Sequence, residues 1–120
     1  MQKELRLRKS KDFSDVYRLG RSWANDLLVL KVLAADADGV SRCGFAVGKR
    51  TGNAVVRNTI KRRLREAVRH TPAKCGWDMI FIARGKARSA DYHQLKASVR
   101  GLLRRADLLA SAFRTEKNNV

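Results

Sequence analysis

Residues that bind metal ions, form disulfide bonds or interrupt helices are scarce in this chain. Its 120 residues include 2 cysteines, 2 histidines and 1 proline. Cys43 and Cys75 are far apart and neither belongs to a Cys-x-x-Cys pair, so the ligand count of a zinc site is not reached. We expect both to be reduced, buried thiols beside strands of a cytoplasmic protein.

Long apolar runs are also missing. No stretch approaches the roughly 20 apolar residues that a membrane-spanning helix needs. Residues 1–9 lack the apolar core of a signal peptide, so we expect a cytoplasmic protein rather than an exported one.

Acidic residues are few beside the basic ones. The chain has 27 Lys and Arg residues against 11 Asp and Glu residues, a formal net charge of +16. Repulsion among these charges opposes compaction, and binding to a polyanion relieves it. Nucleic acid is therefore the first candidate partner, and an anionic membrane surface is the second. With 44% hydrophobic residues, the chain has enough apolar side chains to form the core of one domain.

The basic residues concentrate in a predicted helix that begins after Asn53 and ends before Pro72. Gly52 permits the preceding turn, and the Asn53 side chain is suited to cap the helix. At about 100° per residue, an apolar stripe and an adjoining basic arc of roughly 140° separate cleanly. The stripe consists of Val56, Ile60, Leu64, Ala67 and Val68. The arc consists of Arg57, Asn58, Lys61, Arg62, Arg65 and Arg69.

This basic arc has two interpretations, a solvated face or a surface that binds a polyanion. Solvated faces usually mix signs, because like charges four residues apart repel by a few tenths of a kcal/mol. The arc instead carries a same-sign ladder with no acidic residue to relieve it: Arg57, Lys61, Arg65 and Arg69. We therefore favour the polyanion-binding surface.

The remaining pattern predicts an α+β fold, a sandwich of one mostly antiparallel sheet with helices packed on it. The predicted order is α-β-β-β-α-β-α: a helix over 11–19, strands over 21–25, 27–34 and 41–48, the basic helix, a strand over 77–84 and a long helix from Asp91. Ser10 is expected to cap the first helix, and Gly20 to end it. The turn residues 36–39 predict a hairpin between the strands over 27–34 and 41–48. The apolar face of the last helix extends through Leu109 to Phe113.

No combination of residues predicts a self-contained active site. His70 and His93 have no acidic partner in the sequence pattern, and Walker, nucleophile and metal-ligand motifs are missing. We therefore expect the chain to act by binding.

The segment Gly52–Arg65, GNAVVRNTIKRRLR, resembles the signature of the bacterial ribonuclease P protein subunit. Lys11-Asp12-Phe13 with Val16 and Tyr17 resembles the first helix of that family. The segments 45–49 and 78–84 resemble two of its strands, and the resemblance covers most of residues 5–110. It implies a single RNA-binding domain over residues 1–120, with residues 1–8 and 115–120 flexible. It also implies a left-handed strand–helix–strand crossover, opposite to the usual hand.

The resemblance implies a protein that binds a catalytic RNA and the 5′ leader of precursor tRNA. The RNA would perform the Mg²⁺-dependent endonucleolytic removal of the leader, so the protein would contain no catalytic or metal-binding residue. We expect no membrane contact and no obligate protein partner. The implied contacts to the catalytic RNA are Lys49, Arg50, Asn53, Arg57, Asn58, Lys61, Arg62, Arg65 and Arg69.

The leader would lie in a cleft between the first helix and the sheet, lined by Phe13, Tyr17 and Lys31. Aromatic rings there can stack on unpaired bases, although Phe13 and Tyr17 fit a plain core role equally well. Lys31 stands where the family leads us to expect an aromatic residue, and we expect it to contact leader phosphate.

Thr59 stands where the family has the second arginine of its Arg-Asn-Arg core. We suggest that Arg63, four residues later, supplies the missing charge.

Two other functions fit the composition. A module that binds ribosomal or other structured RNA would share the charge pattern without affecting tRNA processing. A binder of anionic membranes would need large apolar residues free to insert beside the basic arc. Val56, Ile60 and Leu64 are better explained as core.

Overall fold

The computed structural model describes residues 6–35 and 39–110. Its elements are, in order, α1 (Ser10–Leu19), β1 (Arg21–Ala24), β2 (Leu28–Ala34), β3 (Arg42–Ala46), the 3₁₀ helix η2 (Lys49–Thr51), α2 (Ala54–Arg69), β4 (Trp77–Ala83), the 3₁₀ helix η3 (Gly85–Ser89) and α3 (Tyr92–Arg105). The predicted α+β class and the order α-β-β-β-α-β-α are confirmed.

The four strands form one sheet in the order β1-β2-β4-β3. β2 pairs antiparallel with both β1 and β4, whereas β3 pairs parallel with β4. The predicted hairpin between β2 and β3 is therefore wrong, because β4 lies between them. In β4, Met79, Ile80 and Phe81 are all buried, so this strand needs cover on both faces and takes a central position.

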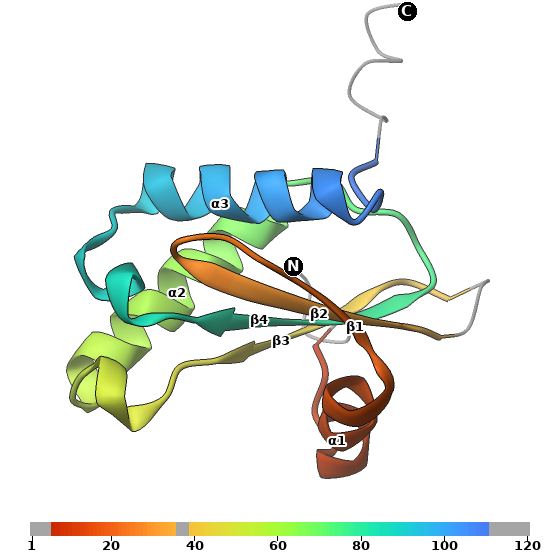
Figure 1. The fold of residues 1–120 in the computed structure, drawn as a ribbon, viewed down its shortest axis with the longest axis horizontal. Helices are drawn as coiled ribbons and strands as arrows, with labels where there is room; N and C mark the ends of the chain where they lie inside the picture. Colours follow the sequence, from red (N-terminus) through yellow and green to blue (C-terminus); the bar gives the residue numbers. More distant parts are fainter. Residues whose placement is uncertain (1–5, 36–38, 111–120) are drawn as a thin grey trace, which may run out of the picture.

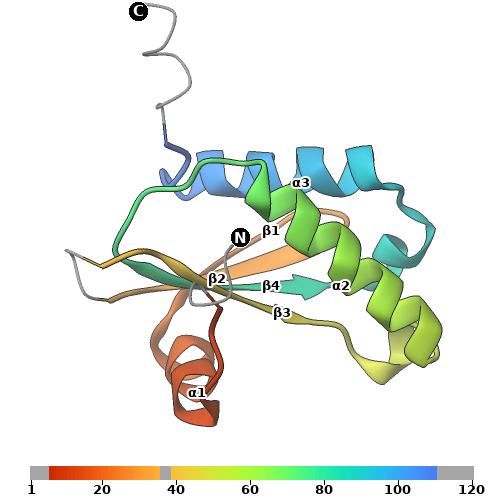
Figure 2. The same cartoon turned by 180° about the vertical axis from the view of Figure 1, so that it is seen from behind.

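Helices cover both faces of the sheet (Figures 1 and 2). α2 and α3 pack side by side on one face, and α1 packs on the other. α2 is the crossover between the parallel strands β3 and β4. The left hand of this crossover stays a prediction from the family resemblance.

The two faces bury cores of different size. The core under α2 and α3 is large and includes four residues of the predicted apolar stripe: Ile60, Leu64, Ala67 and Val68. Val56, the fifth residue of the stripe, is half-buried against it. Among the described residues, the core under α1 has only three buried members, Leu7, Val16 and Ile80. Because the stripe packs on the sheet, it offers no large apolar side chains for insertion into lipid.

The ends of α2 and α1 are set in different ways. Asn53 caps α2 as predicted, since its Oδ1 accepts from the Val56 N–H at 3.0 Å. Ser10 was expected to cap α1, but it is the first residue of that helix. Lys9 occupies the cap position without a side-chain hydrogen bond. The predicted end of α1 at Gly20 is confirmed.

α3 is shorter than its apolar periodicity predicts. Asp91 and Gln94 form a reciprocal capping box at its start. The helix ends at Arg105, because the chain then turns through Asp107 at φ 60° and Leu109 forms a β-bridge with Ala73. Phe113 lies outside the described residues, as do residues 36–38 of the predicted turn, residues 1–5 of the predicted flexible segment 1–8, and the predicted flexible segment 115–120. Nearer the start, Arg6 forms a bridge to Cys43.

The two cysteines differ in exposure. Cys43 is buried in β3, and burial raises the pKa of its thiol to about 12. Cys75 is exposed, so the expectation that it is buried was wrong. Cys75 lies in the segment before β4 rather than within a strand, where alternate residues face the core.

We expect a thiol reagent at pH 8 to label one cysteine in the native protein and two after unfolding, because only the Cys75 sulfur is accessible. Cys75→Ser should abolish the native reaction. Cys43→Ser should leave it intact, and fast labelling of two thiols in the native wild type would contradict the burial of Cys43.

Candidate nucleic-acid interface

The basic arc lies on the side of α2 that faces β3. Asn58, Arg62 and Arg69 are exposed, whereas Arg57, Lys61 and Arg65 are half-buried. The apolar stripe packs α2 onto the sheet, so the arc is held on a rigid 16-residue helix. Such a helix can present several cationic groups to one anionic surface at fixed spacing.

Two arginines of the arc have unsatisfied donors. The Nε atoms of Arg57 and Arg65 are buried and have no hydrogen-bond partner among the described residues. A buried polar group without a partner costs free energy, and a phosphate oxygen is a strong acceptor for a guanidinium. A phosphate oxygen bound at the arc can therefore accept the hydrogen bonds that these two Nε–H groups do not make among the described residues.

The arc is nearly free of acidic neighbours. Arg69 is the exception, since its Nη2 lies 3.9 Å from Oε2 of Glu66. We expected no acidic residue to offset the positive charge of this ladder, and for Arg69 that expectation is wrong. For Arg57, Lys61 and Arg65 no ion pair is formed within residues 6–35 and 39–110.

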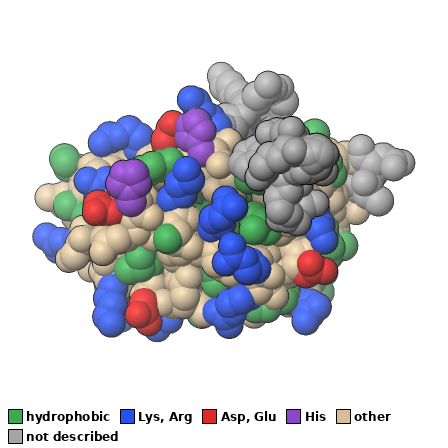
Figure 3. Space-filling view, turned by 90° about the horizontal axis from the view of Figure 1, so that it is seen from above, with side chains coloured by type: hydrophobic (Ala, Val, Ile, Leu, Met, Phe, Trp, Pro, Cys, Tyr) green, Lys and Arg blue, Asp and Glu red, His purple; other side chains and the backbone are tan. Residues whose placement is uncertain are grey.

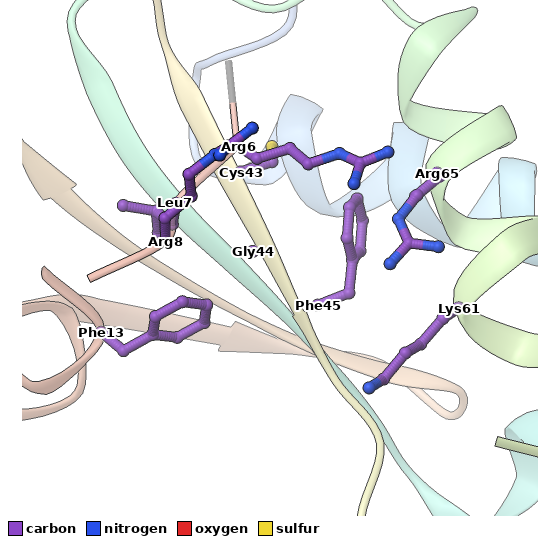
Figure 4. Close-up of a pocket in the computed structure, with 9 residues that line it drawn as sticks. All are labelled: Arg6, Leu7, Arg8, Phe13, Cys43, Gly44, Phe45, Lys61 and Arg65. Atoms are coloured by element: carbon purple, nitrogen blue, oxygen red, sulfur yellow. The ribbon is translucent and has the colours of Figure 1, made fainter. Parts of the chain in front are cut away.

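A cavity of about 500 Å³ adjoins the arc and spans β3 from α1 to α2 (Figure 4). Its lining is Arg6, Leu7, Arg8, Phe13, Cys43, Gly44, Phe45, Lys61 and Arg65. Lys61 and Arg65 extend from α2 toward β3, and Phe13 approaches the same strand from α1. Aromatic rings and cations in one cavity are the combination that binds single-stranded nucleic acid.

Sequence reasoning placed only Phe13, Lys61 and Arg65 in a binding site and missed the other six residues of this lining. Arg6, Leu7 and Arg8 belong to a segment expected to be flexible, and Cys43, Gly44 and Phe45 belong to the strand predicted over 41–48, to which no binding role was assigned. The β-bridge between Arg6 and Cys43 and the burial of Leu7 under α1 bring the N-terminal segment to this cavity. No local sequence signal predicts either contact.

The three predicted leader-cleft residues lie on the α1 side of the sheet, but only Phe13 lines the cavity. Tyr17 is 42% exposed on α1, and partial burial raises the pKa of its hydroxyl. Lys31 lies on β2 opposite Ile80, a member of the core under α1. The Lys31 Nζ donates to Oγ of Ser22 at 2.9 Å.

The residues of η2 that were predicted to contact the catalytic RNA lie at one end of the sheet. Lys49 and Arg50 are exposed in η2, which packs against η3. η3 adds the exposed Lys86 and Arg88. The parallel strands β3 and β4 end at the same edge, and this topology extends the basic surface beyond α2.

Thr59 and Arg63 both bond to backbone carbonyl groups. The Thr59 hydroxyl donates to the Val55 carbonyl at 2.9 Å. Nη1 of Arg63 donates to the Ala90 carbonyl at 3.0 Å, between η3 and α3. Arg63 thus holds α2 to the start of α3, on the side away from the arc. The geometry gives no support to the suggestion that Arg63 replaces the charge missing at Thr59.

Basic side chains are not confined to the arc. Figure 3, viewed onto the layer of α2 and α3, shows Lys and Arg side chains spread over this face with fewer acidic ones. α3 itself contributes Lys96, Arg100 and Arg104, spaced four residues apart. Bulk charge is therefore the alternative that an experiment on the arc must exclude.

The described residues offer no protein-held metal site, because nowhere among them do three His, Cys, Asp or Glu side chains come together. Likewise, among residues 6–35 and 39–110, no helix combines the length and apolar character needed to cross a membrane.

Comparison with known proteins gives one consistent result. The family model described as Ribonuclease P matches residues 1–107. The ribonuclease P protein component of Roseiflexus castenholzii is 45% identical over 115 residues, which cover 93% of each chain. That of Herpetosiphon aurantiacus is 46% identical over 110 residues, which cover 90% of this chain and 89% of the relative.

Solved structures agree with the sequence comparisons. The Staphylococcus aureus RNase P protein superposes with a TM-score of 0.78 at 33% identity, covering 88% of this chain and 98% of its own. The Thermotoga maritima RNase P protein gives a TM-score of 0.73 at 30% identity, covering 83% and 96% respectively. On both sequence and fold, the chain belongs to the family of bacterial ribonuclease P protein components.

Proposed function

We propose that this protein binds the RNA subunit of ribonuclease P through the basic arc of α2 and holds the 5′ leader of precursor tRNA beside α1. In this role it supports the removal of the leader, while the RNA performs the hydrolysis. The magnesium ions of that reaction are assigned to the RNA.

The observation that supports this proposal best is the cavity between α1 and α2. Lys61 and Arg65 belong both to the arc and to the cavity lining, and Phe13 lies at the opposite side. One continuous surface thus offers cations for a folded RNA backbone and an aromatic ring for an unpaired base. Arginine suits the first task, because its planar fork donates two parallel hydrogen bonds to a phosphate.

Leader binding follows from the position of Phe13 and Tyr17 on one helix. Tyr17 is one turn after Phe13, and both lie on the side of the sheet that carries Lys31. In this proposal, a strand of RNA bound at Phe13 in the cavity continues along α1 toward Tyr17, outside the cavity. Stacking on exposed rings tolerates any base, as a leader of variable sequence requires.

The test is reconstitution with a ribonuclease P RNA and a precursor tRNA at low magnesium concentration. We expect cleavage at the mature 5′ end only when protein and RNA are combined, because the protein neutralises phosphates that magnesium otherwise screens. The protein alone and the RNA alone are the controls. Binding to the RNA without any gain in cleavage would instead indicate a general structured-RNA module.

A further inference from the structure

A partly buried ion-pair network connects α1 to the sheet. Nε and Nη2 of Arg42 bind the two carboxylate oxygens of Asp78 at 2.9 and 2.7 Å. Nη1 of Arg42 donates to Oδ2 of Asp12 at 3.2 Å. Asp78 is only 7% exposed, so its carboxylate is shielded from water, whereas the Arg42 side chain stays partly exposed. The network joins three elements, α1, β3 and β4.

Asp12 has a different role from the second acidic residue of α1. Asp15 pairs with Lys11 and Arg18, both on its own helix. Asp12 instead pairs with a residue 30 positions away on β3. Of these two carboxylates, only that of Asp12 can therefore help to fix the position of the helix over the sheet.

A steric contact lies next to this ion pair. The Phe13 ring packs over Gly44, where an added Cβ would come within 2.5 Å of the ring. Gly44 is two residues from Arg42 on β3, so the two share a face of the sheet. Consecutive residues of α1 thus dock on alternate residues of one strand.

The other end of α1 is also held closely. An added Cβ at Gly20 would lie 2.6 Å from the carbonyl oxygen of Val32 on β2. The core under the helix has only three buried members among the described residues, so apolar packing alone holds α1 less strongly than α2. Polar and steric contacts at the two ends therefore decide where α1 lies.

We infer that Asp12 and Arg42 are positioning residues for the leader: their ion pair sets the place of α1, and thus of Phe13 and Tyr17, relative to the sheet. This inference rests on the proposed leader cleft and adds residues that do not themselves contact RNA. Arg42 already donates to two carboxylates, so its guanidinium is occupied in the free protein.

A direct contact between Arg42 and a leader phosphate is the competing explanation. The two explanations predict opposite results for Asp12→Asn. Loss of the carboxylate would free Nη1 of Arg42 and strengthen a direct phosphate contact. If the ion pair acts by positioning α1, the same change weakens leader binding, because the helix loses its link to β3.

The experiment compares Asp12→Asn with Asp15→Asn in the reconstituted holoenzyme. Both remove one negative charge from α1, so their effects on long-range attraction to RNA are matched. Asp12→Asn leaves the Arg42–Asp78 pair intact, and we expect the protein to fold. Affinities are measured for precursor tRNA with its leader, for mature tRNA and for the catalytic RNA alone.

We expect Asp12→Asn to weaken binding of the leader-bearing substrate by about 3- to 10-fold, the range of one ordinary hydrogen bond, because the neutral amide oxygen is a weaker acceptor for Arg42 than the carboxylate. Mature tRNA and catalytic RNA should bind as before, and Asp15→Asn should change none of the three. Asp12→Glu, which keeps the carboxylate, should recover part of the loss. Gly44→Ala, which displaces Phe13, should reproduce the leader-specific defect.

Two results would overturn the inference. Equal effects of Asp12→Asn and Asp15→Asn would leave only a charge effect, and tighter leader binding by Asp12→Asn would favour direct contact by Arg42. Equal affinity of the wild-type holoenzyme for substrate with and without the leader would instead reject the leader cleft itself.

Discussion

Replacing Arg57 and Arg65 together with alanine is expected to weaken binding to ribonuclease P RNA by about 100- to 10,000-fold, because each loses charge-assisted hydrogen bonds of about 1.5–3 kcal/mol. Both guanidinium groups have a buried Nε without a partner among the described residues of the free protein. Their removal should therefore leave the stability of the protein nearly unchanged. Titration of labelled RNA at several salt concentrations measures the effect.

The salt dependence of RNA binding is an independent test of the same double variant. The slope of log affinity against log salt should become shallower by about 0.7–0.9 for each phosphate that the variant no longer neutralises. Arg100→Ala with Arg104→Ala on α3 is the control, since it removes the same charge from another helix. If this control weakened binding as much as the arc variant, bulk charge rather than the arc would explain the affinity.

Leu64→Ala should destabilise the protein by about 2–5 kcal/mol, the usual cost of truncating a fully buried leucine. Leu64 is 0% exposed in the core between α2 and the sheet, one residue before Arg65. The free energy of unfolding in urea measures the loss. Saturating catalytic RNA should restore part of it, because the RNA binds only the folded protein.

Val55→Ala is the matched control for Leu64→Ala, because it truncates an apolar residue of the same helix that is 74% exposed. Its effect should lie within about 0.5 kcal/mol of zero. Similar destabilisation by the two variants would mean that α2 does not pack on the sheet through the predicted stripe.

The sequence predicts α2 well because its determinants are local. The cap at Asn53 and the separation of the stripe from the arc depend only on residues within the helix. The strand order is harder to predict than α2, because it depends on which strands are buried on both faces of the sheet. β4 follows β3 by about 30 residues and still separates it from β2. Turn chemistry at 36–39 therefore predicts the wrong neighbour.

The candidate site was predictable only in part, for a similar reason. The arc residues Lys61 and Arg65 follow from periodicity, but the contacts that complete the cavity cross the fold. Arg6 reaches it through a bridge to Cys43. The network of Asp12, Arg42 and Asp78 joins residues 30 and 36 positions apart. Neither arrangement leaves a pattern of spacing in the sequence.

The central position of β4 has a consequence for synthesis of the chain. Among the described strands, β3 has no neighbour in the sheet except β4, so it cannot join the sheet until residues 77–83 have left the ribosome. Until then the apolar stripe of α2 lacks much of the surface on which it packs. Long-range pairing of this kind slows folding. α2 thus becomes fixed late, only after residues 77–83 are available to pair with β3.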